Sequence, residues 1–197
     1  MSTTKFEEKK GCIISNGMDL MWDLGYNGTS VNDIVKAADV PKGSFYFYFQ
    51  SKEDFAIQAL KEYFKEMYGP VSQDLLHGEG SPLTRIKRFY HTRINMLEEH
   101  MEEGNRGCFA CNLSSEVAEH MPGIQAEVAR IHNQVLHDLN AIGKKAQEEG
   151  EIGKNVETDK MFAFLEDAGK GAMVSLKAVN DKSPIESLRY MVDRILS

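Results

Sequence analysis

The 197-residue chain has little of what builds secreted or membrane-embedded proteins. Its three cysteines, Cys12, Cys108 and Cys111, are too few and too odd in number for a disulfide scaffold, which is typical of a reducing compartment. No apolar run reaches the roughly 18 residues of a membrane-spanning helix. The N-terminal stretch MSTTKFEEKKG mixes both charges and has no apolar segment like that of a signal peptide. We therefore expect a cytoplasmic protein without membrane contact.

Catalytic patterns are also scarce. The C-terminal part contains neither the Glu-x-x-His pattern of metal-binding helical bundles nor the Gly-x-Ser-x-Gly pattern of serine hydrolases. We therefore expect no enzyme, no cofactor and no metal site. A mass of 22.2 kDa is ample for buried cores, and we expect two domains.

Positive charge is the third deficit. The formal net charge is −7, and residues 1–60 hold six lysines against eight acidic residues. A nucleic-acid binder is expected to be basic, so a chain with this charge, if it bound nucleic acid, would make few ionic contacts per protomer and would depend on a dimer to double them.

The most informative segment is 25–52, GYNGTSVNDIVKAADVPKGSFYFYFQSK. Ser30 is a good N-cap, and Asp33 places a carboxylate in the first turn, where the helix dipole and free N–H groups favour it. An apolar stripe at helical spacing follows: Val31, Ile34, Val35 and Ala38. These features predict a short helix.

A turn and a second helix are expected next. Asp39 tolerates left-handed backbone angles, Val40 can fill the angle between two helices, and Pro41 suits the start of a new helix. Phe45 and Phe49 lie four residues apart and can share a buried face. The segment therefore predicts helix, turn and helix.

A buried strand over 45–49 is the alternative, because consecutive aromatic residues favour strands. Pro41 and Gly43 closely precede this run, and Ser51 with Glu53 begins what reads as another helix. No pairing strand is predicted nearby, so the helix is favoured.

Several positions between Ile14 and Leu60 follow one known pattern: Gly25-Tyr26, Thr29-Ser30, 33–38 (DIVKAA), 42–46 (KGSFY), Tyr48-Phe49 and 51–53 (SKE). This pattern resembles the TetR/AcrR-type transcriptional regulators. Departures are Gly17, Met21, Asp39 and Pro41, where the family usually has Ala, Phe, Gly and Ser. Gly17 should weaken the first helix by about 1 kcal/mol relative to Ala.

The resemblance implies an all-α protein with an N-terminal three-helix DNA-binding domain, residues 1–51, that contains the helix-turn-helix. Residues 52–197 would form a C-terminal helical effector-binding and dimerisation domain. As a homodimer through its last two helices, the protein would place two reading helices in successive major grooves, about 34 Å apart. Its partners would be double-stranded operator DNA of near-palindromic sequence and a small-molecule effector that releases it, which favours a repressor.

The family motif also implies residue roles. Residues expected to hold phosphates are Ser30, Ser44, Tyr46, Tyr48 and Lys52, and residues expected to face base edges are Lys42, Gly43 and Phe47.

Downstream, breakers divide the chain into further helices. The expected ranges are 52–68, 71–76, 82–100, 108–120, 124–149, 158–179 and 183–196. The last two carry apolar stripes: Met161, Phe164, Leu165, Ala168, Ala172 and Leu176, then Ile185, Leu188, Met191, Val192 and Ile195. Gly169, Gly171 and Ala172 would let another backbone approach. The stripes could complete the monomer's core or form the dimer interface, and the resemblance favours the interface.

The segment 107–112, GCFACN, allows three interpretations. Cys108 follows Arg106 in the first turn of an expected helix, where the dipole and a neighbouring cation stabilise a thiolate, so it could be a sensing thiol. Cys108 and Cys111 could equally be small buried residues. A zinc half-site with His132 and His137 is the third option, and their spacing argues against it. Some TetR-like regulators that respond to electrophiles or oxidants look similar in this Gly-Cys segment.

An effector pocket has candidates only. They are Tyr90, Arg93, Asn95, Met96 and His100 on one helix, Cys108, Phe109 and Asn112 around the next, and Phe162, Met173 and Lys177 on a later one. The predicted function is thus a ligand- or redox-responsive transcriptional regulator. The alternative is a helical-bundle thiol redox or ligand-binding protein that uses Cys108 and Cys111.

Overall fold

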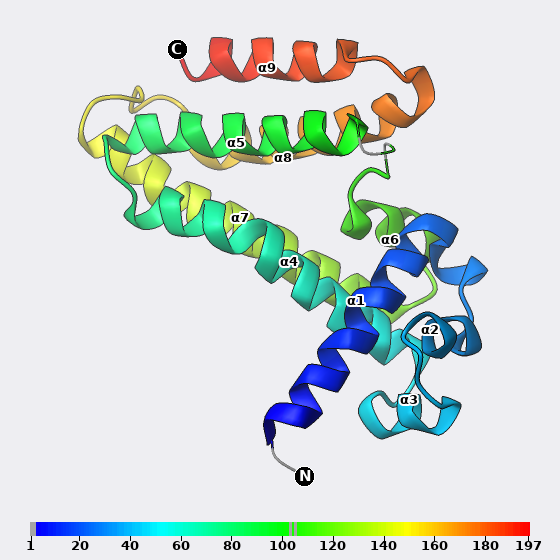
Figure 1. The fold of residues 1–197 in the computed structure, drawn as a ribbon. Coiled ribbons are helices and arrows are strands. Elements are labelled where there is room, and N and C mark those ends of the chain that lie inside the picture. The colour runs from blue at the N-terminus through cyan, green and yellow to red at the C-terminus, as the bar shows by residue number, and fades with distance from the viewer. Residues whose placement is uncertain (1–2, 103, 105) are drawn as a thin grey trace. The chain divides into compact units, whose positions relative to one another are not determined.

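A computed structural model describes residues 3–102, 104 and 106–197. All regular structure in these ranges is helical, which confirms the predicted all-α fold. The helices, shown in Figure 1, are α1 (Thr3–Gly28), α2 (Val31–Ala37), α3 (Lys42–Tyr48), α4 (Lys52–His77), α5 (Pro82–Glu102), α6 (Phe109–Val117), α7 (Pro122–Glu148), α8 (Thr158–Val179) and α9 (Ser183–Ile195). None of the described helices is long and apolar enough to cross a membrane.

The described residues form two compact units. Unit 1 falls within Met1–Phe64 and Phe109–Ala129, and unit 2 within Lys65–Cys108 and Arg130–Ser197. Helices α4 and α7 therefore contribute residues to both units. The boundary expected after residue 51 divides the chain by function and stays a prediction.

Aromatic side chains form the core of unit 1. Phe45, Phe49 and Phe55 are at most 1% exposed, and their ring centroids lie 5.1 to 5.8 Å apart. Tilted and edge-on ring pairs at this distance add to the free energy gained by burial. Around this core, α1 packs against α2 and α6, and α2 packs against α3. Residues 45–48 are thus helical and Phe49 is the C-cap of their helix, so the strand alternative is wrong.

The turn between α2 and α3 has the predicted geometry. Asp39 has a left-handed backbone with a φ of 51°, and the Val40 N–H donates to the Val35 carbonyl at 2.9 Å. Pro41 directly precedes α3 with an extended backbone. Because these constraints are local, the sequence could predict this turn.

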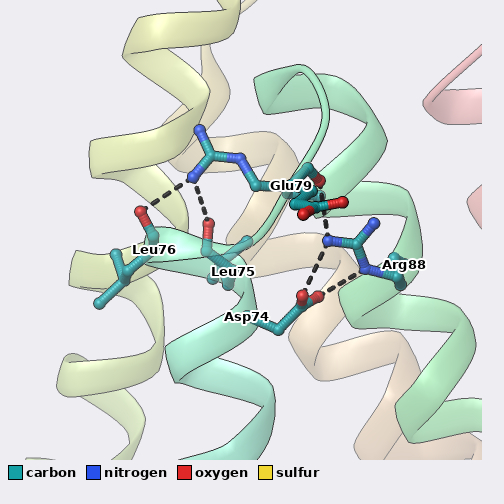
Figure 2. Close-up of polar contacts among 6 residues, drawn as sticks. Asp74, Leu75, Leu76, Glu79 and Arg88 are labelled. Carbon is teal, nitrogen blue, oxygen red and sulfur yellow. Dashed lines mark hydrogen bonds and ion pairs between the residues drawn. The ribbon is translucent and has the colours of Figure 1, made fainter.

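In unit 2, α9 packs against α5 and α8, and Figure 1 shows α9 running alongside α5. Two arginines of α5, Arg85 and Arg88, form hydrogen bonds to the end of α4 and to the loop that connects the two helices (Figure 2). Arg85 donates from one nitrogen, Nη1, to the carbonyls of Leu75 and Leu76 at 3.1 and 2.9 Å. Arg88 donates to both Asp74 oxygens at 2.6 and 2.8 Å, and to the Glu79 carbonyl at 3.0 Å. Carbonyls at the end of α4, which lack helical partners, are thereby paired.

Some expected helix boundaries are wrong. Gly69 and Pro70 were expected to end a helix, yet α4 continues through them to His77. Both residues are exposed, whereas Tyr68 and Val71 beside them are buried, so packing of the inner face holds the helix together despite the missing N–H. Helix α6 is also shorter than expected, and it begins at Phe109 rather than Cys108.

Candidate functional site

The first helix of the helix-turn-helix begins with a reciprocal cap. The Ser30 hydroxyl accepts from the Asp33 N–H at 3.2 Å, and the Asp33 carboxylate accepts from the Ser30 N–H at 2.9 Å and the Ser30 hydroxyl at 2.6 Å. These hydrogen bonds, first those from the Ser30 side chain, lower the pKa of Asp33 below its usual value. The predicted N-cap is confirmed, and Ser30 remains exposed at the start of α2.

Helix α3 is divided into a buried side and an exposed side. Phe45 is fully buried, and Phe49, which follows the helix, is 1% exposed. Lys42 and Gly43 are exposed, and so are Tyr46 (58%) and Phe47 (65%), while Ser44 and Tyr48 are half-buried. A Cβ placed on Gly43 would meet no atom within 4 Å, so another molecule can approach this backbone closely.

Phe6 in α1 was not predicted to belong to this surface. Its ring centroid lies 5.7 Å from that of Phe47 and 4.8 Å from that of Tyr48. Phe6 is far from α3 in sequence. The only signal in the sequence was that Phe6 is an aromatic residue within a polar and charged N-terminal stretch. Phe6 restricts the orientations open to two side chains of α3.

Lys52 has protein partners. Its ammonium donates to the Tyr26 and Thr29 carbonyls at 2.9 and 3.0 Å and lies 4.1 Å from the centre of the Tyr26 ring. Burial lowers the pKa of Lys52, and the charge of Glu116 opposes that shift. An ammonium has three donors, so one remains available beside the two carbonyls.

In unit 2, two of the expected effector residues, Tyr90 and the half-buried Arg93, belong to a polar cluster around the buried Glu166. Arg93 donates to Glu166 at 2.6 Å, and its guanidinium lies 4.9 Å from the centre of the Phe89 ring. Burial disfavours the charged Arg93, but the Glu166 carboxylate more than offsets this and raises the pKa of Arg93. Tyr90 is 5% exposed, and burial, reinforced by Glu166, raises the pKa of its hydroxyl.

Helix α7 carries a second buried acid. Asp138, 6% exposed, accepts from the Tyr68 hydroxyl at 2.9 Å, the Ser72 hydroxyl at 3.1 Å and the Gln134 amide at 2.9 Å. Burial, followed by the Asp138 hydrogen bond, raises the pKa of Tyr68. The charge of Arg93 also acts on Tyr68, so the two clusters are electrostatically connected.

Asp138 and Glu166 are absent from the effector residues predicted from the sequence, although the sequence carries a signal for both. Each takes a helical position of an apolar stripe: Val135, Asp138, Leu139 and Ile142 on α7, and Phe162, Leu165, Glu166 and Ala172 on α8. Carboxylates are rarely buried without partners, so an acid in such a stripe indicates a polar site.

The other candidates are placed less conclusively. Cys108 is half-buried, directly precedes α6, and interacts electrostatically with Arg93. His100 contacts the Met96 carbonyl of its own helix at 2.7 Å through Nδ1, and Lys177 on α8 is exposed. Met96 and Met173 are half-buried. The structure therefore groups Tyr90, Arg93 and Cys108 by their interactions.

Two candidates fall in unit 1. Phe109 is fully buried, with ring centroids 5.9 Å from Trp22 and 5.8 Å from Tyr63, so its visible contacts are with the core of unit 1. Asn112 is half-buried on the same helix. As for metals, the described residues hold no group of three His, Cys, Asp or Glu side chains that could bind an ion, and His132 instead contacts Lys170 at 3.1 Å.

Comparisons with known proteins agree with this arrangement. A family model described as bacterial regulatory proteins, tetR family, matches residues 13–59, and one described as Tetracyclin repressor-like, C-terminal domain, matches residues 82–192. The HTH-type transcriptional repressor DhaR of Mycobacterium sp. (strain GP1) is 29% identical over 180 residues, which cover 91% of this chain and 88% of DhaR. The HTH-type transcriptional repressor NemR of Escherichia coli (strain K12) is 33% identical over 107 residues, 54% of this chain and 53% of NemR.

Solved structures give the same result over nearly the whole chain. The reduced form of E. coli NemR superposes with a TM-score of 0.84 at 25% identity, covering 95% of this chain and 96% of that one. The regulatory protein TetR from Rhodobacter sphaeroides superposes with a TM-score of 0.80 at 28% identity, covering 94% and 97%.

Proposed function

Because this chain belongs to the TetR family of bacterial regulatory proteins, we propose that it represses transcription as a homodimer bound to a near-palindromic operator. It is a DNA-binding transcriptional regulator, and its relatives DhaR and NemR are repressors. An effector that binds unit 2 releases it from DNA. It acts in the cytoplasm, where its operator lies, and it catalyses no reaction.

The observation that carries this proposal is the two-sided helix α3. A helix that buries Phe45 and exposes Lys42, Gly43 and Phe47 next to a left-handed turn can enter a major groove without loss of its core. Exposed Phe47 is also not isolated, because its ring lies beside those of Phe6 and Tyr48, and contiguous exposed apolar side chains often mark a binding surface.

We assign the side chains of this surface to two roles. Lys42, Gly43 and Phe47 face base edges and read the sequence. Ser30, Ser44, Tyr46, Tyr48 and the remaining donor of Lys52 contact phosphates and set the register.

We place the dimer contact on α8 and α9. Apolar side chains remain exposed there although the neighbouring stripe is buried: Phe164, Val174, Val179, Tyr190 and Met191. A Cβ on Gly169 or Gly171 would meet no atom of this chain within 4 Å, which leaves space for a second backbone. The dimer doubles the phosphate contacts of an acidic protein that makes few.

The effector site is the polar cluster around Arg93, Glu166 and Asp138. A small molecule can compete for these groups and so favour one conformation, provided that its affinity for two states differs. Modification of Cys108, within the field of Arg93, is a second route. The similarity to a repressor solved in its reduced form supports this redox route.

A gel-shift titration with the DNA upstream of the protein's own gene tests the proposed function. We expect a discrete complex at low salt that unrelated DNA of equal length does not compete away. Equal competition by unrelated DNA would contradict a sequence-reading role and would favour the alternative of a thiol or ligand-binding bundle.

A further inference from the structure

We propose that Glu116 on α6 is a positioning residue that, together with Lys52, holds the corner between α1 and α2 and thereby links α6 to the reading helices. The corner comprises residues 25–29. This inference rests on the proposed function, because its main measurable consequence is operator affinity.

The corner begins where α1 departs from helical geometry. Gly25 has a φ of 78° and a ψ of 168°, which only glycine adopts readily. The next two N–H groups, those of Tyr26 and Asn27, donate to the two carboxylate oxygens of Glu116 at 2.8 and 2.7 Å. Such charge-assisted hydrogen bonds are about twice as strong as neutral ones.

Lys52 binds carbonyl oxygens of the same segment, whereas Glu116 binds its N–H groups. Its ammonium takes the carbonyls of Tyr26 and Thr29, and the Thr29 hydroxyl donates to the Gly25 carbonyl at 2.8 Å. Thr29 is fully buried. The carboxylate thus holds N–H groups of the corner, and the ammonium holds carbonyl groups.

The fit between α6 and the corner is close. A Cβ on Gly25 would lie 2.8 Å from one Glu116 oxygen and 3.2 Å from the other. Any other side chain at position 25 would therefore displace the carboxylate as well as strain the backbone.

The corner determines where the helix-turn-helix, formed by α2 and α3, begins. Thr29 is followed at once by Ser30, the cap of α2, and α2 leads to α3 through the fixed turn at Asp39. Helix α6 in turn begins directly after Cys108, and its first residue, Phe109, lies against Trp22 of α1. A change that displaces α6 would therefore reach α2 through Glu116.

The test compares Glu116→Ala with Glu119→Ala, which removes the same charge from an exposed position three residues further along. Alanine is a strong helix former, and Glu116 is exposed, so the first variant should fold. We expect Glu116→Ala to weaken operator binding by roughly tenfold and to accelerate hydrogen exchange of the Tyr26 and Asn27 amides, and Glu119→Ala to change neither. Unchanged operator affinity in Glu116→Ala, or an equal loss in both variants, would overturn the proposal.

Lys52→Met provides an independent measurement through amide exchange. If Lys52 holds the corner, the variant accelerates hydrogen exchange of the Tyr26 and Asn27 amides, besides reducing the slope of log affinity against log salt by about 0.9 for the lost phosphate contact. Unchanged exchange of both amides in Lys52→Met would overturn this part of the proposal.

Amide exchange of the unaltered protein distinguishes a failure of this inference from a failure of the proposed function. Protection of Tyr26 and Asn27 is expected even if no operator is found, in which case the proposed function fails and the contacts of Glu116 with the corner stand. Rapid exchange of both amides in the unaltered protein would refute these contacts, even if Glu116→Ala does not fold.

Discussion

At the scale of single residues, Gly17 shows how a local rule and packing can disagree. Helix propensity alone marks it as a weak point of α1. In the folded chain, however, a Cβ at this position would lie 2.6 Å from the tip of Phe55 and 2.7 Å from a methyl of Ile34, both of which are fully buried. The small residue therefore permits close contact between α1 and the aromatic core.

Gly17→Ala should consequently destabilise the protein. The gain in helix propensity of about 1 kcal/mol is outweighed by overpacking, which costs roughly 1–3 kcal/mol. The control is Gly11→Ala in the same helix, where a Cβ would meet nothing within 4 Å and a gain in stability is expected. Denaturant unfolding measures both, and stabilisation by Gly17→Ala would contradict the packing argument.

Phe47 is the residue whose change should alter sequence preference. Its exposed ring can contact thymine methyls or base edges, so Phe47→Ala should change affinity ratios between single-base operator variants by up to roughly tenfold. Ser44→Ala, at an expected phosphate contact, should weaken all variants alike. Binding titrations over an operator panel compare the two, and identical profiles would refute the division of roles.

At the scale of helices, local signals predicted most, and long-range contacts explain the errors. The Ser30 cap and the Asp39 turn each depend on neighbours within a few residues, and each is confirmed, whereas Pro41 directly precedes α3 and the helix itself begins at Lys42. The break expected at Gly69-Pro70 is wrong because the buried face of α4 outweighs one missing hydrogen bond.

Contacts between distant residues could not be predicted in this way. Glu116 and Tyr26 are 90 residues apart, and nothing in a single sequence pairs them. The same holds for Tyr68 with Asp138, 70 residues away, and for Arg93 with Glu166, 73 residues away. Sequence patterns thus indicated the helix-turn-helix, whereas the partners of residues 25–29 and the acids of the proposed effector site emerged only from the structure.

The connection between α4 and α5 yields a prediction for pH. Arg88, first through its hydrogen bonds and then through its charge, lowers the pKa of Asp74 below the ordinary value of 3.8. The folded state therefore favours the ionised carboxyl, and the stabilisation is complete above pH 3.8 and is lost as the pH falls through the lowered pKa.

Asp74→Asn should remove this dependence. Because the Asp74 side chain is 41% exposed, we expect a loss of no more than about 1 kcal/mol at neutral pH, vanishing at the acid end. Unfolding free energies measured from pH 7 downwards test this against Glu66→Gln, which changes an exposed acidic residue of the same helix. A difference that grows towards low pH would contradict the assigned sign.

At the scale of the whole molecule, the exposed apolar side chains of α8 and α9 are where we propose that a second copy packs. Phe164→Arg places a charge where we expect the partner to pack, so it should yield monomers in light scattering and weaken operator binding on the order of 100-fold, because half of the phosphate contacts are lost. Phe164→Leu should preserve the dimer. A dimer that survives Phe164→Arg would place the interface elsewhere.

The central claim is that two copies of α3 read one DNA site. Sequencing the genomic fragments retained by the purified protein tests this most directly. We predict one enriched motif with two inverted half-sites whose centres lie about one helical turn, roughly 34 Å, or a multiple of it apart, and we predict that the motif disappears with Phe164→Arg. Retained fragments without any shared motif would contradict the account.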